Sequence, residues 1–229
     1  TPEYGLLLEQ NRAGDVLIQV EADVDSEYDY ELLGYITPKK MGQAYHCPVF
    51  NGLSKQTTSE QLMDLGTQLN IHGIVPMFHV VGVTPEAADV HTAFLGRKDP
   101  PVVTITNEDL AQARAEISAG TGKADFCILG CPHLTINQVG SIAKMLDGQQ
   151  LAGQLYISTS TSTKELAQRM GYLDIIHKAG GEIVINSCVD QPCWSHLYGM
   201  SGVTESPKCA YYTKRWNMTF TVKSIPACI

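Results

Sequence analysis

Residues 126–146 read FCILGCPHLTINQVGSIAKML, and this stretch contains the pattern that decides the fold. It opens with four apolar residues, Phe126–Leu129, a run of the length of a buried strand. After a polar loop, Thr135 and Gln138 have the spacing of a capping box, which predicts that a helix begins there. That helix has one apolar face, formed by Ile136, Val139, Ala143 and Leu146. The stretch therefore predicts a strand, a loop and a helix in direct succession.

The same succession recurs along the chain. Further strands are predicted at residues 16–21, 74–81, 102–106, 154–158, 182–186 and 216–222. Further helices are predicted to begin at Thr58 with Gln61 in a capping box, at Thr84 followed by Pro85, at Asn107, and at Ser162 with Glu165 in a capping box. Residues 23–45, rich in Tyr, Gly and charge, are predicted to be loop or edge structure. Strands alternating with helices imply right-handed βαβ units and an α/β fold with mostly parallel sheets.

Pro100 and Pro101 interrupt this alternation and suggest a division into two parts. We expect residues 1–88 to form an incomplete first α/β subdomain and residues 89–200 to form a second one. Residues 201–229 are expected to return as a tail that packs on the first subdomain. The chain begins without methionine and without a basic-then-apolar signal pattern, so we expect it to be a piece of a longer protein.

Composition excludes several classes of protein. The chain has 229 residues, of which 44% are hydrophobic and 17% charged, so it can bury a core. Its net charge of −8 argues against non-specific binding to nucleic acid or to an anionic membrane. No apolar run approaches the roughly 18 residues that span a bilayer. The seven cysteines are odd in number and irregularly spaced, which favours reduced thiols in a cytoplasmic protein.

Polar residues follow the predicted strands, at the edge where parallel α/β sheets bind ligands. Cys131 follows Phe126–Leu129 near a helix start, where a thiolate would be stabilised, and a pocket role and a buried thiol both remain open. Ser160 could cap a helix or contact a ligand, and Thr84 could begin a helix or line a pocket. Cys127 is expected in the core. A nucleotide-dependent α/β enzyme is disfavoured because the chain has no GxGxxG and no GxxxxGK[ST] motif.

Several blocks are specific enough to compare with known families. They are TPEYG (1–5), HVVGVTPEA (79–87), LGCPH (129–133), GGEIV (180–184) running into Cys188, and ACI (227–229). Together they resemble the large catalytic region of the aconitase X family, over essentially the whole chain. The resemblance implies an aconitase-like three-layer αβα fold, with this chain as the C-terminal half of the catalytic part.

The resemblance also implies a function. Family members are hydro-lyases that dehydrate a small hydroxy acid such as cis-3-hydroxy-L-proline or mevalonate 5-phosphate. They carry an iron–sulfur cluster (4Fe–4S or 2Fe–2S) or a mononuclear iron held by three cysteines. The expected partners are an N-terminal half and a swivelling small domain or subunit, both outside these 229 residues. The isolated chain is therefore expected to be inactive, to lack the iron centre and to self-associate through an unpaired patch.

The resemblance assigns site residues of the family to individual positions of this sequence. Cys188 and Cys228 match cluster ligands of the family, and the third ligand is expected outside this chain. The remaining matches divide into catalytic candidates, which are Glu86, His133 and Ser206, and substrate-binding candidates, which are Thr84, Cys131, Ser160 and Lys208.

Three departures from the family pattern leave substrate and activity open. They are residues 70–73, residues 186–187, and Glu205, which stands where the family has asparagine. They favour an alternative in which the chain is a non-catalytic α/β module, derived from that family, that binds a metabolite or a partner.

Overall fold

The computed structural model describes residues 5–42, 44–118, 120 and 124–229. The chain forms two compact units, Thr1–Ala113 and Arg114–Ile229. Of the block at residues 1–5 that supports the family resemblance, residues 1–4 lie outside the described residues.

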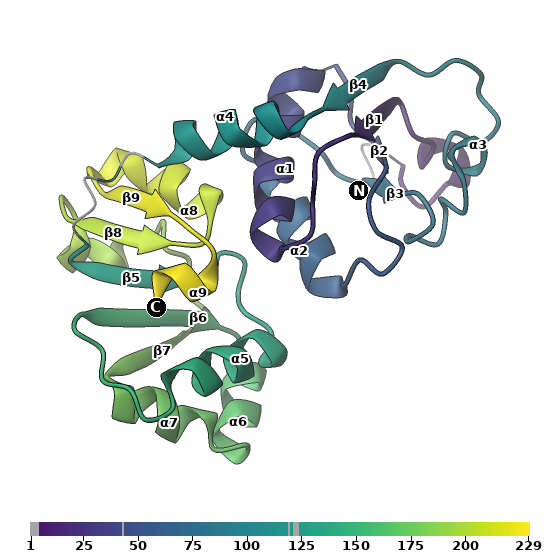
Figure 1. Cartoon of the computed structure of the whole chain (residues 1–229). Coiled ribbons are helices and arrows are strands. Elements are labelled where there is room, and N and C mark those ends of the chain that lie inside the picture. The colour runs from purple at the N-terminus through teal and green to yellow at the C-terminus, as the bar shows by residue number, and fades with distance from the viewer. Residues whose placement is uncertain (1–4, 43, 119, 121–123) are drawn as a thin grey trace. The chain divides into compact units, whose positions relative to one another are not determined.

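The first unit is built on a four-stranded parallel sheet in the order β3-β2-β1-β4 (Figure 1). Its strands are β1 (Val16–Val20), β2 (Pro48–Asn51), β3 (His79–Val80) and β4 (Val102–Ile105). Its helices are the 3-10 helix η1 (Glu9–Asn11), α1 (Glu27–Met41), α2 (Ser59–Gln68) and α3 (Val90–Ala93). The capping box predicted for α2 is confirmed, because the Thr58 side chain accepts from the Gln61 N–H and the Gln61 side chain accepts from the Thr58 N–H.

Helix α1 occupies residues that were predicted to be loop or edge structure, and that prediction is wrong. Ser26 and Asp29 form a capping box at its start. Its buried residues face several directions around the axis, because the helix packs against both the sheet and α2. A helix buried on several sides has no single polar face, so its sequence lacks the periodic signal that identifies a surface helix.

Two other local predictions in this unit are wrong. The strand predicted at residues 74–81 is reduced to His79–Val80, and Ile74 is exposed. Thr84 does not begin a helix, because its hydroxyl accepts from the Val80 N–H within a turn at 3.0 Å. The next helix is α3, whose start is capped by Asp89.

The second unit contains a five-stranded parallel sheet in the order β7-β6-β5-β8-β9. Its strands are β5 (Phe126–Leu129), β6 (Gln154–Thr159), β7 (Gly181–Ile185), β8 (Ser201–Thr204) and β9 (Thr219–Val222). From β5 the chain adds β6 and β7 on one side, and then returns to add β8 and β9 on the other. The order of strands thus reverses between β5 and β8, the place where open α/β sheets bind ligands.

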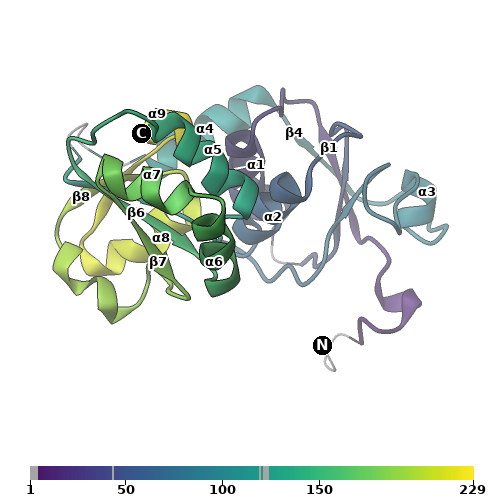
Figure 2. The same cartoon turned by 90° about the horizontal axis from the view of Figure 1, so that it is seen from below.

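Helical segments cover both faces of this sheet. They are α5 (Ile136–Leu146), α6 (Thr161–Arg169), α7 (Tyr172–Ala179), η2 (Pro192–Leu197), α8 (Pro207–Tyr212), η3 (Thr213–Trp216) and α9 (Ile225–Cys228), and α4 (Asn107–Ile117) contains the division between the units. Figures 1 and 2 show α5, α6 and α7 together on one face. On the other face, Tyr156 of β6 packs edge-on against Trp194 of η2, with ring centroids 5.3 Å apart. This confirms the predicted three-layer α/β fold.

The predicted boundaries differ from the units that form. The division falls at Ala113 rather than at residue 88. Residues 201–229 belong to the second unit, because β8 and β9 extend its sheet by pairing with β5 and with each other. The position of the tail depends on backbone pairing with a strand that is distant in sequence. The local sequence pattern of the tail does not indicate which strand that is. No helix in the described parts of the chain has the length and apolar character needed to cross a membrane.

Gly34 lets α1 and α2 pack closely, and we expect Gly34→Ala to destabilise the first unit by about 1–3 kcal/mol. A Cβ at Gly34 would lie 2.6 Å from the backbone oxygen of Leu65. Gly73→Ala is the matched control, because its nearest atom would lie at 3.4 Å. Urea unfolding followed by circular dichroism measures both variants. Equal stabilities of the two would contradict close helix packing as the reason for Gly34.

Candidate functional site

The loop that follows β5 lies at the centre of the carboxyl edge of the second sheet, because β5 is the middle strand. It contains Gly130, Cys131, Pro132 and His133, and the Cys131–Pro132 peptide bond is cis. The segments that follow β6, β7 and β8 begin at the same edge, because the strands are parallel. They bring Ser160, Cys188 and Ser206 to that edge. The four predicted site residues Cys131, His133, Ser206 and Lys208 come from two of these neighbouring segments.

Gly130 sets the direction of the loop. Its φ is +110°, and a Cβ there would lie 2.2 Å from the backbone oxygen of Ser158. Only glycine fits such a position, because its backbone both has a positive φ and approaches the neighbouring strand. The Gly130 N–H donates to Oε1 of Glu205 at 2.6 Å, and the Cys131 N–H donates to the same oxygen at 3.3 Å.

Glu205 is the functional candidate that sequence reasoning missed. It was noted only as a departure from the family pattern, although a carboxylate directly after a buried strand at the ligand-binding edge is itself a signal. Glu205 is 5% exposed, and burial raises the pKa of its carboxyl group. The N–H groups of Gly130 and Cys131 act in the opposite direction by favouring the charged form.

Cys131 is a thiol at neutral pH rather than the thiolate that its sequence context suggested. Burial raises its pKa to about 12, and the negative charge of Glu205 contributes in the same direction. The hydroxyl of Ser206, which is hydrogen-bonded to the sulfur, and the charge of Lys208 lower it by less. The helix start cannot stabilise a thiolate here, because α5 begins only at Ile136.

His133 connects this loop to the segment after β7. Its Nε2 lies 2.8 Å from the carbonyl oxygen of Ser187, which accepts the Nε2 proton. Ser187 precedes Cys188, so the ring holds the backbone that presents that exposed thiol. The pKa values of Cys131 and Cys209 are both raised in part by Cys188, so the three sulfurs lie within electrostatic reach of one another.

Ser206, Ser160 and Lys208 occupy helix starts. Ser206 is fully buried, and its hydroxyl accepts from the Cys209 N–H at 3.3 Å, which caps α8. Lys208 follows in the first turn of α8. Ser160 caps α6 by accepting from the Thr163 N–H at 3.1 Å, so the helix begins one residue after Ser160 and not at the predicted Ser162. Ser160 therefore caps a helix, which is one of the two roles that the sequence left open; the other was ligand binding.

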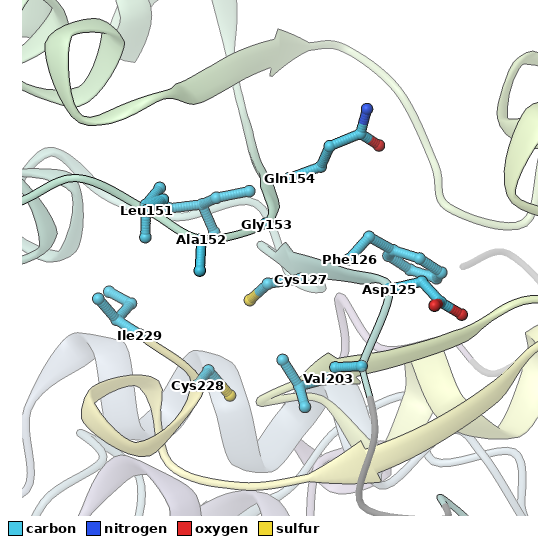
Figure 3. A pocket seen from close by; sticks show the side chains of 12 residues that line it. Asp125, Phe126, Cys127, Leu151, Ala152, Gly153, Gln154, Val203, Cys228 and Ile229 are labelled. Carbon is cyan, nitrogen blue, oxygen red and sulfur yellow. The ribbon is translucent and has the colours of Figure 1, made fainter.

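Cys228 lies away from Cys188. It lines a pocket of about 190 Å³ with Cys127, and the side chains in Figure 3 show the two sulfurs in the same hollow. The pocket is also lined by Asp125 and Gly153, which precede β5 and β6, so it lies toward the amino ends of the strands. A hydrogen bond with Cys228, together with burial, raises the pKa of Cys127 well above its ordinary value. Cys228 thus meets Cys127 in this pocket, whereas Cys188 is exposed after β7, and their role as ligands of one iron centre stays a prediction.

Glu86 and Thr84 belong to the first unit. Both oxygens of Glu86 accept from Nε of Arg12, at 2.8 and 2.9 Å. Arg12 precedes β1, so this ion pair lies toward the amino ends of that sheet, opposite to the edge expected for a ligand. Within the described residues, no three His, Cys, Asp or Glu side chains converge as a metal site.

Two domain profiles of one family match the chain. The aconitase X second domain matches residues 14–115, and the aconitase X third domain matches residues 124–229. The phosphomevalonate dehydratase large subunit of Methanothermobacter thermautotrophicus is 35% identical over 213 residues, which cover 93% of this chain and 51% of that subunit. The cis-3-hydroxy-L-proline dehydratase of Pseudomonas aeruginosa is 33% identical, covering 83% of this chain and 34% of that enzyme.

A solved structure gives the same result for the fold. The holo-form of aconitase X from Thermococcus kodakaraensis superposes with a TM-score of 0.86 at 30% sequence identity. The match covers 99% of this chain and 57% of that one. The chain spans about half the length of the phosphomevalonate dehydratase large subunits that it matches.

We expect Cys131 to react slowly with iodoacetamide, and its rate to rise about tenfold per pH unit up to a pH of about 11. At about pH 8 an ordinary free cysteine with a pKa near 8.5 is about one quarter thiolate. With a pKa of about 12, Cys131 is about one ten-thousandth thiolate. Peptide mass spectrometry of the labelled chain measures this, with the exposed Cys188 as the comparison and urea-unfolded protein as the control. Equal labelling of both cysteines in the folded chain would contradict the raised pKa of Cys131.

The free energy of unfolding of Glu205→Gln minus that of the parent chain should increase as the pH rises from about 4 to 7. A carboxyl group whose pKa is higher in the folded state destabilises the fold as it ionises, and glutamine does not ionise. The stability that the parent has below the unfolded pKa is therefore lost as the pH rises through the folded pKa. Urea unfolding at several pH values measures the difference.

Glu165→Gln on the exposed face of α6 is the control for the loss of one carboxyl group at the surface. If the Glu205→Gln difference is flat, the N–H donors of Gly130 and Cys131 offset burial, and if it falls with pH, they outweigh burial.

Proposed function

The chain belongs to the aconitase X family, and we propose that it forms part of a hydro-lyase that removes water from a small hydroxy acid. The observation that carries the proposal is the group of side chains at the carboxyl edge of the second sheet, beside the reversal of strand order. It combines a cation, Lys208, with Ser206, His133 and the Cys131 thiol. The dehydratase activity named for the relatives supports the same reaction class.

The substrate class follows from the charge of the site and from the relatives. The ammonium group of Lys208 can bind the carboxylate or phosphate of a hydroxy acid. Relatives are named for phosphomevalonate and for cis-3-hydroxy-L-proline, and both names describe a hydroxylated acid. We propose a substrate of this kind, such as mevalonate 5-phosphate or hydroxyproline.

Elimination of water requires a group that accepts the proton next to the acid function. Of the three candidates, Ser206 contacts Cys131 and lies in the same segment as Lys208, but it is fully buried and caps α8, so we assign it to positioning that segment. His133 donates its Nε2 proton to the carbonyl oxygen of Ser187, so we propose that it holds the loop in place. Glu86 is engaged by Arg12 in the first unit, so we propose that the base belongs to the part of the protein outside these 229 residues.

The iron centre of the family would polarise the leaving hydroxyl group as a Lewis acid. Cys188 fits one thiolate ligand, because it is exposed at the carboxyl edge and lies within electrostatic reach of Cys131 and Cys209. The described residues do not contain a complete set of ligands, so we propose that this chain contributes Cys188 and that the rest of the protein contributes others. Cys228, beside Cys127, is the weaker candidate.

The proposal implies partners. The chain covers half of relatives that are named large subunits, so we propose that the remaining part of a large subunit and a small subunit complete the active site. Such an arrangement would leave the 229 residues without turnover on their own. We place the assembled enzyme in the cytoplasm, in keeping with its reduced cysteines.

The test uses the full-length parent protein with its small subunit, assayed for water loss from both hydroxy acids. We expect turnover, with Lys208→Met raising KM by about tenfold or more, because a charged hydrogen bond of about 1.5–3 kcal/mol is lost. Cys188→Ala should lose iron and activity, whereas Cys127→Ala should lose only about 1 kcal/mol of stability. Iron content and visible absorbance of anaerobic samples measure the metal.

Two other results would change the assignment. If Cys228→Ala loses iron while Cys188→Ala keeps it, the ligand belongs to the pocket beside Cys127. If the assembled protein binds a hydroxy acid without turnover, the chain is part of a binding module instead of a lyase.

A further inference from the structure

We propose that Glu205 is a positioning residue that fixes the loop at residues 130–133 by accepting two backbone N–H groups. Glu205 follows β8 and the loop follows β5, so the contact joins the two strands between which the strand order reverses. The two partners are 75 residues apart in sequence, so the contact is a tertiary one. The consequence for catalysis rests on the function proposed above, whereas the positioning itself does not.

The geometry of the loop start supports this role. Oε1 of Glu205 lies 2.6 Å from the Gly130 nitrogen and 3.3 Å from the Cys131 nitrogen. Both N–H groups thus share one acceptor, while a Cβ at Gly130 would lie 2.2 Å from the Ser158 oxygen of β6. Without an acceptor at this place, the Gly130 donor would be buried and unsatisfied, which is costly.

The other end of the loop is held separately. The Leu134 N–H donates to the Ser158 oxygen at 3.0 Å, and the Thr159 hydroxyl donates to the Leu134 oxygen at 2.6 Å. Both of these contacts come from β6. The backbone of the loop is thus held at one end by β6 and at the other by Glu205, and loss of Glu205 releases the backbone at the end that contains Cys131.

Glu205 positions the site and is not itself placed to touch a substrate. Oε1 is occupied by two N–H groups, and Oε2 accepts the hydroxyl proton of Thr204 at 3.3 Å. The residue is 5% exposed. The charged or titratable groups near it are Cys127, Cys131 and Cys209, and Lys208 acts on Cys131 from α8. A carboxylate enclosed in this way acts through the loop that it holds.

Movement of the loop would be transmitted to two candidate site residues. Cys131 follows Gly130 directly and contacts Ser206. His133 donates to the carbonyl oxygen of Ser187, next to Cys188. A single buried acceptor therefore sets the relative positions of the segments that follow β5, β7 and β8.

The first test, in the 229-residue chain, separates the effect of the side-chain length of Glu205 from the effect of its charge. Glutamine keeps the acceptor oxygen at the same distance and loses the charge, whereas aspartate keeps the charge and is one carbon shorter. We expect amide hydrogen exchange at Gly130 and Cys131, measured by NMR, to stay within about threefold of the parent in Glu205→Gln. Exchange should become at least about tenfold faster in Glu205→Asp and in Glu205→Ala. Glu165→Gln is the matched surface control and should leave both amides unchanged.

The readout is local, which separates positioning from general loss of stability. Ile142→Ala removes a fully buried side chain from α5 and should accelerate exchange across the unit, without selecting Gly130 and Cys131. The proposal is overturned if Glu205→Asp leaves both amides as protected as in the parent chain, or if Glu205→Gln exposes them as much as Glu205→Asp does.

The second test uses the assembled dehydratase. Glu205→Asp should lower kcat by about tenfold or more with a smaller change in KM, because displaced groups act mainly in the transition state, and Glu205→Gln should restore most of it. If the parent enzyme shows no turnover, the proposed function fails and the exchange experiment alone decides the role of Glu205. If turnover is normal in Glu205→Asp, Glu205 does not position the catalytic groups.

Discussion

The way the chain leaves β5 is the constraint on which the second unit depends. Gly130 turns the backbone with a φ of +110° beside the Ser158 oxygen, and the two N–H groups that it exposes must then find a buried acceptor. Glu205 provides it from the next strand in space. A carboxylate can occupy this low-dielectric position because backbone donors surround one of its oxygens, although burial still raises its pKa.

The parallel sheet explains why this one loop matters so much. In the order β7-β6-β5-β8-β9, the central strand has neighbours on both sides, so its loop contacts segments that arrive from both directions. His133 reaches the segment after β7, and Leu134 is held by β6. Side chains from distant parts of the sequence therefore share one edge, which is the general reason that open α/β sheets form ligand sites there.

The cysteines show how environment separates residues of one type. Cys209 is buried and Cys131 is half-buried near a carboxylate, and both thiols stay protonated. Cys188 is exposed at the same edge. Cys228 packs with Cys127 in a separate pocket on the face covered by α5, α6 and α7, toward the strand amino ends. The spacing of these cysteines in the sequence does not predict their burial or their neighbours. Strand pairing in the sheet, and not distance along the chain, determines which sulfurs meet.

The α/β class, the three βα transitions β4–α4, β5–α5 and β6–α6, and the capping boxes at Thr58 and Thr135 can be predicted from the sequence, because these features depend on residues a few positions apart. The sequence also contained the blocks that identify the family. Only the tertiary structure decided that residues 27–41 form a buried helix, that β8 and β9 extend the second sheet, and that Glu205 meets Gly130. Each of those outcomes depends on a partner far away in the chain, and a local pattern cannot specify that partner.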